Sequence, residues 1–168
     1  MRKLILTLLA FGMIVPMIAQ IIKEETLSEV TVMAVNYKYL DNVQSESAAV
    51  PVKMLEKKVA TYDLKGSELY QDDYDLYQVS FYIPEGKIVA AYDKDGKIIR
   101  TIEKFENVRL PKTIMMALTE RFPNWKVAKD VYRVSYHNKK GTDKKYKIIL
   151  ENGDKRIRVK TDAAGNFL

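Results

Sequence analysis

Apolar and polar residues alternate along two stretches of the chain, Tyr77–Ile83 and Lys145–Leu150. A period of two is the side-chain period of a β-strand, so the pattern predicts half-buried strands. Pro84–Gly86 and Asn152–Gly153 follow these stretches as turns. Further strands are predicted over residues 87–92 and 97–103, and the second copy is predicted to repeat the first of these around Ile157 and Val159. A hairpin is predicted from Val131–Tyr136 with its tip at His137–Gly141.

Two stretches have the three-to-four-residue spacing of amphipathic helices instead. Each opens on a proline, at Val50–Pro51 and at Leu110–Pro111, where the missing N–H costs no helical hydrogen bond. One face of the first helix carries Val52, Leu55, Val59 and Tyr62, and one face of the second carries Ile114, Met115, Leu118 and Phe122. Pro123 ends the second helix, and Trp125 is predicted to be buried just beyond it.

The segment Tyr77–Ile99 matches the segment Tyr146–Leu168 without a gap at an offset of 69. Identical residues include Tyr77 and Tyr146, and Gly96 and Gly165. The match predicts an α+β fold made of two tandem modules, residues 50–109 and 110–168, each a helix packed on an antiparallel β-sheet.

The N-terminus has the pattern of a secretory signal. Arg2 and Lys3 precede an apolar run from Leu4 to Ala19, which predicts a signal peptide over residues 1–19 and cleavage before Gln20. An uncleaved membrane anchor is the alternative, because the apolar run approaches the roughly 20 residues of a spanning helix. The expected location is periplasmic or secreted, without stable membrane insertion after signal removal.

Residues 20–49 are predicted to be an N-terminal strand and a linker. The stretch from Val30 to Leu40 is rich in β-branched and aromatic residues, which favours a strand. Asp41–Ala49 is polar and without period, which is typical of a linker.

The amino-acid composition indicates a folded chain and excludes cysteine chemistry. Apolar residues make up 47% and charged residues 30% of the 168 positions, which indicates a folded chain. The chain has no cysteine, so it has neither disulfides nor a thiol for catalysis or metal binding. Residues 20–108 hold 11 Lys and Arg against 16 Asp and Glu, net −5, and residues 109–168 hold 15 against 6, net +9. This asymmetry indicates either an anionic partner or attraction between the two halves.

The motifs that would carry metal or catalytic chemistry are incomplete. Asp93–Gly96 begins like a calcium loop, but Lys104 stands where the bidentate acid is needed, so a tight turn is the better interpretation. Asp72–Asp75 is interpreted as a solvated acidic loop. His137 is the one histidine and lacks the partners of a triad or zinc site. We predict no cofactor, no metal site and no catalytic residue.

A basic sheet face is the best candidate for a binding site. If the apolar residues of the second half point inward, strand alternation sends six cations outward together. They are Arg133, Lys145, Lys147, Arg156, Arg158 and Lys160. Such a face would hold an anionic polymer, a lipid head group or an acidic protein, and the alternative is a merely solvated surface. The aligned positions of the first half include Gln78, Val89 and Ala91, so the positive face is expected in the second half only.

Several of these motifs resemble a known family. Ala90–Lys97, Leu110–Pro111, Phe122–Trp125 and the closing run with Asn152–Gly153, Asp162 and Gly165 are similar to the PepSY-like proteins, which are related in fold to β-lactamase inhibitor protein and common in Bacteroidetes. The resemblance covers residues 50–168. It implies helix-on-sheet modules and an exported location, and it carries over no inhibitory site.

Two functional hypotheses follow. The first is an exported, non-catalytic binding or inhibitor-like module that engages a protein or an anionic envelope component. The second is a small periplasmic enzyme with an unrecognised carboxylate or tyrosine site. Because no nucleophile, base and orienting group occur together, the sequence favours the first. Nucleic acid is not expected as a partner of an exported protein.

Overall fold

The computed structural model describes residues 36–168, which form an α+β fold with three helices and one six-stranded antiparallel sheet. The strands lie side by side in chain order. They are β1 (Leu76–Ile83), β2 (Gly86–Asp93), β3 (Ile98–Glu106), β4 (Lys126–His137), β5 (Gly141–Asn152) and β6 (Lys155–Asp162). The helices are α3 (Tyr37–Val43), α4 (Val50–Ala60) and α5 (Lys112–Arg121).

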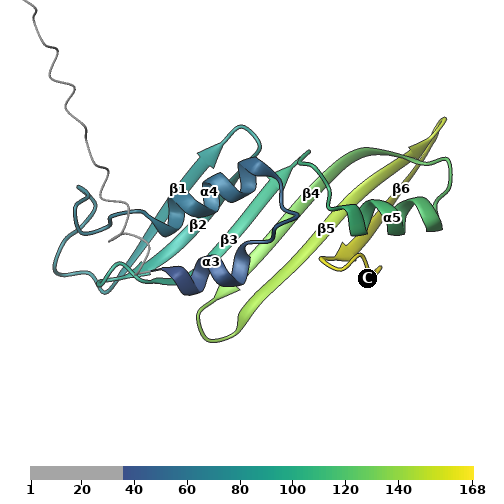
Figure 1. The fold of residues 1–168 in the computed structure, drawn as a ribbon. Helices are drawn as coiled ribbons and strands as arrows, with labels where there is room; N and C mark the ends of the chain where they lie inside the picture. The colour runs from purple at the N-terminus through teal and green to yellow at the C-terminus, as the bar shows by residue number, and fades with distance from the viewer. Residues whose placement is uncertain (1–35) are drawn as a thin grey trace, which may run out of the picture.

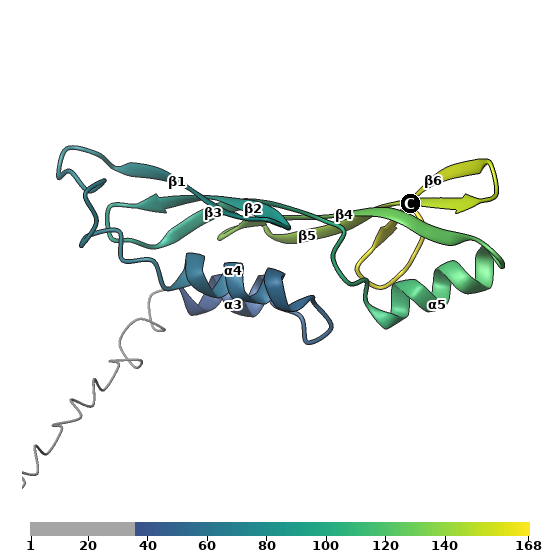
Figure 2. The ribbon, with the colours of Figure 1, turned by 90° about the horizontal axis from the view of Figure 1, so that it is seen from above.

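All three described helices lie on the same side of the sheet, and none of residues 36–168 forms a helix on the opposite side (Figures 1 and 2). We call this opposite side the uncovered face; its side chains are the outward-pointing residues of the six strands. The core lies between the helices and the inner face, where Leu55, Tyr92 and Phe105 are almost wholly buried. None of the helices in residues 36–168 has the length and apolar content needed to cross a membrane.

The helices follow the predicted apolar spacing in part, because Tyr62 and Phe122 lie just beyond the ends of α4 and α5 and are partly buried there. Val52, Leu55 and Val59 of α4 are buried, and so are Ile114 and Leu118 of α5. Met115 was expected on the same face of α5, but its side chain is 42% exposed. A helix turns by about 100° per residue, so the residue after Ile114 leaves the buried face.

The predicted strand at Val30–Leu40 is wrong where the structure describes it, because Tyr37–Val43 forms helix α3. Tyr39 and Val43 are four residues apart and both buried, which is a helical pattern. The side chain of Asn36 fixes the start of this helix: its Oδ1 accepts from Ile98 N at 2.7 Å, and its Nδ2 donates to Gly96 O at 3.1 Å. Tertiary contacts therefore override the β-propensity of this stretch.

The same helix shortens the predicted linker, since Asp41–Val43 belong to α3 and only residues 44–49 connect it to α4. The signal peptide and the rest of the predicted N-terminal strand, residues 1–35, lie outside the described residues.

The repeated segments form two hairpins, β1–β2 and β5–β6. The second strand of each hairpin, β2 or β6, is followed by a turn, and the two turns have the same hydrogen bonds. Asp93 Oδ1 accepts from the backbone N–H of Asp95 and Lys97, both at 2.9 Å. Asp162 Oδ1 accepts from Ala164 and Asn166, also at 2.9 Å. β3 pairs directly with β4, so both hairpins belong to one continuous sheet.

Candidate binding face

The strand register places the six predicted cations on the uncovered face. Inner residues Tyr146, Ile148 and Leu150 of β5 are buried. Their β6 partners are Thr161, Val159 and Ile157, so the residues between them point the other way. On that side Lys145 lies opposite Arg133, and Lys147 lies opposite Lys160. The structure therefore brings the predicted residues onto one surface, and their role in binding stays a prediction.

Neighbouring carboxylates neutralise two of these six cations. Lys145 Nζ lies 2.7 Å from Asp143 Oδ2, and Arg156 Nη2 lies 3.4 Å from Glu151 Oε2. Among residues 36–168, no carboxylate lies within 4.0 Å of the other four. These four are Arg133, Lys147, Arg158 and Lys160.

The positive face was expected in the second half only, but the structure extends it into the first half. Lys104 of β3 lies opposite Arg133, and Lys87 of β2 lies opposite Lys104. Both are on the uncovered face. Glu106 pairs with Lys104 at 2.5 Å and with Lys129 at 2.9 Å. Hydrogen bonds from these two lysines lower the pKa of Glu106 to about 2, so this carboxylate is ionised.

The core contains a pair of buried carboxyl groups that was not predicted from the sequence. Glu56 of α4 is 0% exposed and Glu103 of β3 is 1% exposed. Tyr39 Oη donates to Glu103 Oε1 at 2.9 Å, and Thr101 Oγ1 donates to the same oxygen at 2.7 Å. Glu103 Oε2 and both oxygens of Glu56 have no hydrogen-bond partner among the described residues.

Burial raises the pKa values of Glu56 and Glu103 and so favours their protonated forms. Desolvation, together with the nearby charge of Glu103, raises the pKa of Glu56 to about 8. Desolvation raises the pKa of Glu103 to about 7, against the hydrogen bonds from Thr101 and Tyr39. The sequence did contain a signal: Val52, Leu55, Glu56 and Val59 have the full i, i+3, i+4, i+7 spacing of a buried helix face. Glu56 occupies one of those positions.

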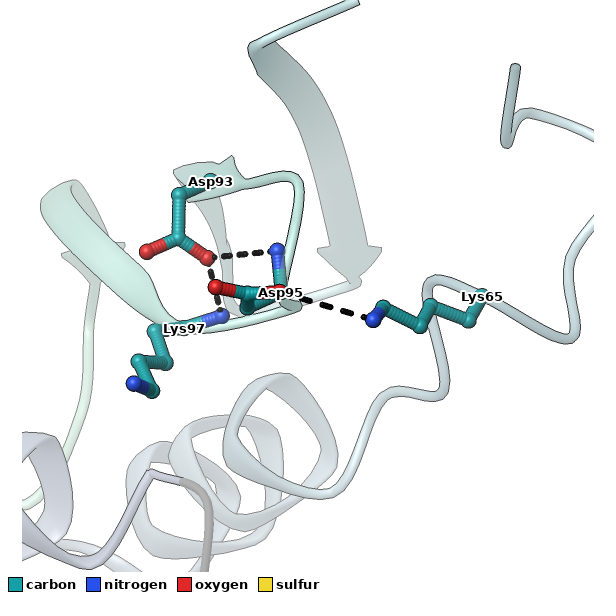
Figure 3. Close-up of polar contacts among 4 residues, drawn as sticks. All are labelled: Lys65, Asp93, Asp95 and Lys97. Carbon is teal, nitrogen blue, oxygen red and sulfur yellow. Dashed lines mark hydrogen bonds and ion pairs between the residues drawn. The ribbon is translucent and has the colours of Figure 1, made fainter. Parts of the chain in front are cut away.

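The turn prediction for Asp93–Gly96 is confirmed. The carboxylate of Asp93 is occupied by two backbone N–H groups, and Gly96 has a φ of 76°, which suits glycine. Asp95 Oδ1 pairs with Lys65 Nζ at 3.5 Å (Figure 3). Within residues 36–168, no three acidic or histidine side chains are arranged to hold a metal ion.

Calcium is accordingly expected to leave thermal unfolding unchanged. A true site would raise the melting temperature progressively with calcium concentration, since binding to the folded state alone adds stability by mass action. Melting curves in calcium and in chelator should overlay. A concentration-dependent rise would show that the turn gathers further ligands in solution.

The other sequence candidates lie apart from the uncovered face or at its margin. Asp72–Asp75 is an exposed loop before β1, as predicted. His137 ends β4 at the β4–β5 hairpin, where its Nδ1 accepts from Lys139 N at 3.1 Å.

Trp125 was expected to be buried but is only partly so. It lines a groove of about 760 Å³ with Met116 and Val127, both exposed, because α5 leaves this end of β4 open.

A solved structure is similar to part of this chain: the crystal structure of a BLIP-like protein from Bacteroides fragilis. The two are 18% identical, with a TM-score of 0.31, over 58% of this chain and 68% of that one. Neither a protein-family model nor a curated protein matches the sequence. A likeness of this size carries no argument about function, and the resemblance to the PepSY-like proteins stays a prediction.

Proposed function

We propose that this chain is a non-catalytic binding module that engages a partner through its uncovered sheet face. The supporting observation is that all three described helices pack on one face of the sheet (Figure 2). The other side presents cations from β2 to β6, and several of them have no carboxylate within 4.0 Å among residues 36–168. Antiparallel sheets commonly leave one face to solvent, and a charged one attracts a partner of opposite charge.

The enzyme hypothesis is less well supported. It requires an accessible carboxylate or tyrosine beside a second functional group. Within residues 36–168, an accessible pair of this chemistry, Tyr70 beside Asp72, lies in the loop before β1. A larger group, Glu56, Glu103 and Tyr39, is buried, and each of its members is at most 1% exposed. A substrate therefore has no access to these atoms in the folded chain.

The proposal includes an exported location. Arg2–Lys3 and the apolar run to Ala19 support a signal peptide over residues 1–19, and the partner would then be an envelope or secreted protein or an anionic envelope polymer. We also infer that residues 50–109 and 110–168 arose as tandem copies. The matching Asp93 and Asp162 turns support this inference.

Blocking the uncovered face should abolish partner binding. The chain has no cysteine, so a single introduced thiol can be labelled selectively with bulky polyethylene glycol. Ser135→Cys places the polymer on exposed β4 at the centre of the face, and Lys58→Cys places it on exposed α4 behind the sheet. Retention of envelope components by the immobilised protein should be lost with the first label and kept with the second.

The two labelled proteins must first show the same circular dichroism spectrum. Equal retention by both would mean that partners bind elsewhere, and the proposed function would be wrong. Equal loss by both would indicate a binding surface that includes the helical layer.

A further inference from the structure

A row of four cations crosses the middle of the uncovered face. Lys87, Lys104, Arg133 and Lys145 are successive partners in the register of β2, β3, β4 and β5. Adjacent strands are about 4.8 Å apart, so the row extends over roughly 14 Å. Like charges directly opposite each other destabilise a sheet. Within residues 36–168 only Lys104 and Lys145 of this row have a carboxylate within 4.0 Å, so pairing inside the sheet does not account for the whole row.

Apolar side chains lie beside the cations. In the next register row, Val89 of β2 lies opposite Ile102 of β3. Ile102 is 61% exposed, although its strand is in the middle of the sheet, and Tyr82 at the β1 end of the cation row is 66% exposed. These cations, Val89 and Ile102 line an open hollow of about 610 Å³.

The charge in the hollow is only partly compensated. Glu106 pairs with Lys104, and Asp143 pairs with Lys145. Within the described chain, neither Lys87 nor Arg133 has a carboxylate within 4.0 Å. These two cations are the cross-strand partners of Lys104, one register row from Ile102, so each lies diagonally across from Ile102.

We infer that the hollow receives an acidic protein segment in which an apolar side chain stands beside carboxylates. This inference rests on the proposed function and names the chemistry of the partner. The apolar side chain would cover Ile102 and Val89, and the carboxylates would pair with Lys87 and Arg133. Charge-assisted pairs around an apolar centre are the arrangement of a protein–protein interface.

The apolar floor distinguishes a protein from other anionic partners. A sulfated or phosphorylated polymer carries its charges without apolar side chains, so it would leave Ile102 uncovered. A flat bilayer surface would not reach the bottom of a hollow. A protruding apolar side chain of a protein would reach the bottom of the hollow and cover Ile102.

Two synthetic peptides test the inference. One alternates aspartate with phenylalanine, and the other replaces each phenylalanine with serine at the same net charge. Each carries a fluorescent label, and anisotropy titration with the purified protein measures its affinity. The acidic–apolar peptide should bind at least about ten-fold more tightly, which corresponds to about 1.4 kcal/mol.

Ile102→Thr should remove this preference, because it deletes the apolar floor and keeps a β-branched side chain in the strand. Val50→Thr is the matched control: Val50 is 68% exposed but lies on α4, behind the sheet. It should leave the preference unchanged. Both variants should first match the parent in circular dichroism and unfolding midpoint.

The inference is overturned if the two peptides bind equally, if neither binds, or if Ile102→Thr and Val50→Thr behave alike. It is also overturned if dextran sulfate or phosphatidylglycerol vesicles compete for the face more effectively than the acidic–apolar peptide. Loss of partner retention on labelling Ser135→Cys, combined with equal peptide binding, would keep the proposed function and reject only this partner chemistry.

Discussion

Replacing both Glu56 and Glu103 by glutamine is expected to stabilise the protein at about pH 8 by roughly 3 kcal/mol or more, and to change little at about pH 5. Both carboxyl groups are buried, and their pKa values are raised to about 8 and about 7. At pH 5 the folded protein holds both groups neutral, and glutamine is a close neutral substitute. At pH 8 the parent must either bury charge or take up protons from a dilute solution.

The sign follows from proton linkage. Between an unfolded pKa near 4.5 and the raised folded values, the folded state binds more protons than the unfolded state. Stability contributed by these groups is therefore full below about pH 4.5 and falls as pH rises toward 8, by about 1.4 kcal/mol per pH unit and group at most. Because the two groups interact, their losses are not simply additive.

Lys144 also acts on this pair: its charge opposes the rise in both glutamate pKa values, and burial lowers its own pKa. The pKa of Glu106 is lowered to about 2, so its contribution is lost only as pH falls below 4.5. Burial raises the pKa of Asp130, but Asp130 is present in both proteins and cancels in the comparison.

Urea unfolding followed by circular dichroism at about pH 5, 6.5 and 8 measures the difference in stability between the parent and the double glutamine variant. Parallel pH profiles for parent and variant would contradict the assignment of Glu56 and Glu103.

Reversing the charge at Arg133 and Lys147 together is expected to weaken partner binding by about 100-fold or more. Both side chains are on the uncovered face without a carboxylate partner in the described chain, and the double change to glutamate shifts the local charge by four units. The fold should tolerate it, because a carboxylate at position 133 lies between Lys104 and Lys145. Binding by the parent should also fall with salt, since exposed charges are screened over roughly 8–10 Å at physiological ionic strength.

Two further double variants calibrate the result. Arg156→Glu with Arg158→Glu reverses charge on edge strand β6, where Glu151 already neutralises Arg156, so the loss should be smaller. Lys57→Glu with Lys58→Glu reverses two exposed charges on α4 and should change affinity less than about two-fold. Affinity is measured by surface immobilisation of each variant and titration of the retained partner. Equal losses for all three would indicate a long-range effect of net charge.

The sequence predicted the sheet well, because its strands follow a local rule. Alternation around Tyr77–Ile83 and Lys145–Leu150 determines which side chains point inward, and the Asp93 and Asp162 turns need only their own residues and glycine. Those features do not depend on distant parts of the chain. The α+β class and the outward direction of Arg133 and Lys147 follow from the same rule.

The errors came from contacts between distant segments. Helix α3 exists because Tyr39 and Val43 pack into the core and Asn36 bonds to Gly96 and Ile98, which are about sixty positions away. The cation row requires β3 to pair with β4, and strand order cannot be read from alternation. Glu56 lies on a buried helix face, and burial against the sheet raises the pKa of both carboxyl groups, with the nearby Glu103 raising that of Glu56 further.

Photo-cross-linking tests the use of the uncovered face most directly. A benzophenone amino acid is placed at Ser135 on β4 or, in a second protein, at Met54, which is 67% exposed on α4. Irradiation of cells that produce each protein is followed by detection of larger covalent species. Our account predicts a discrete cross-linked species from position 135 and none from position 54. Cross-links from position 54 alone would contradict it.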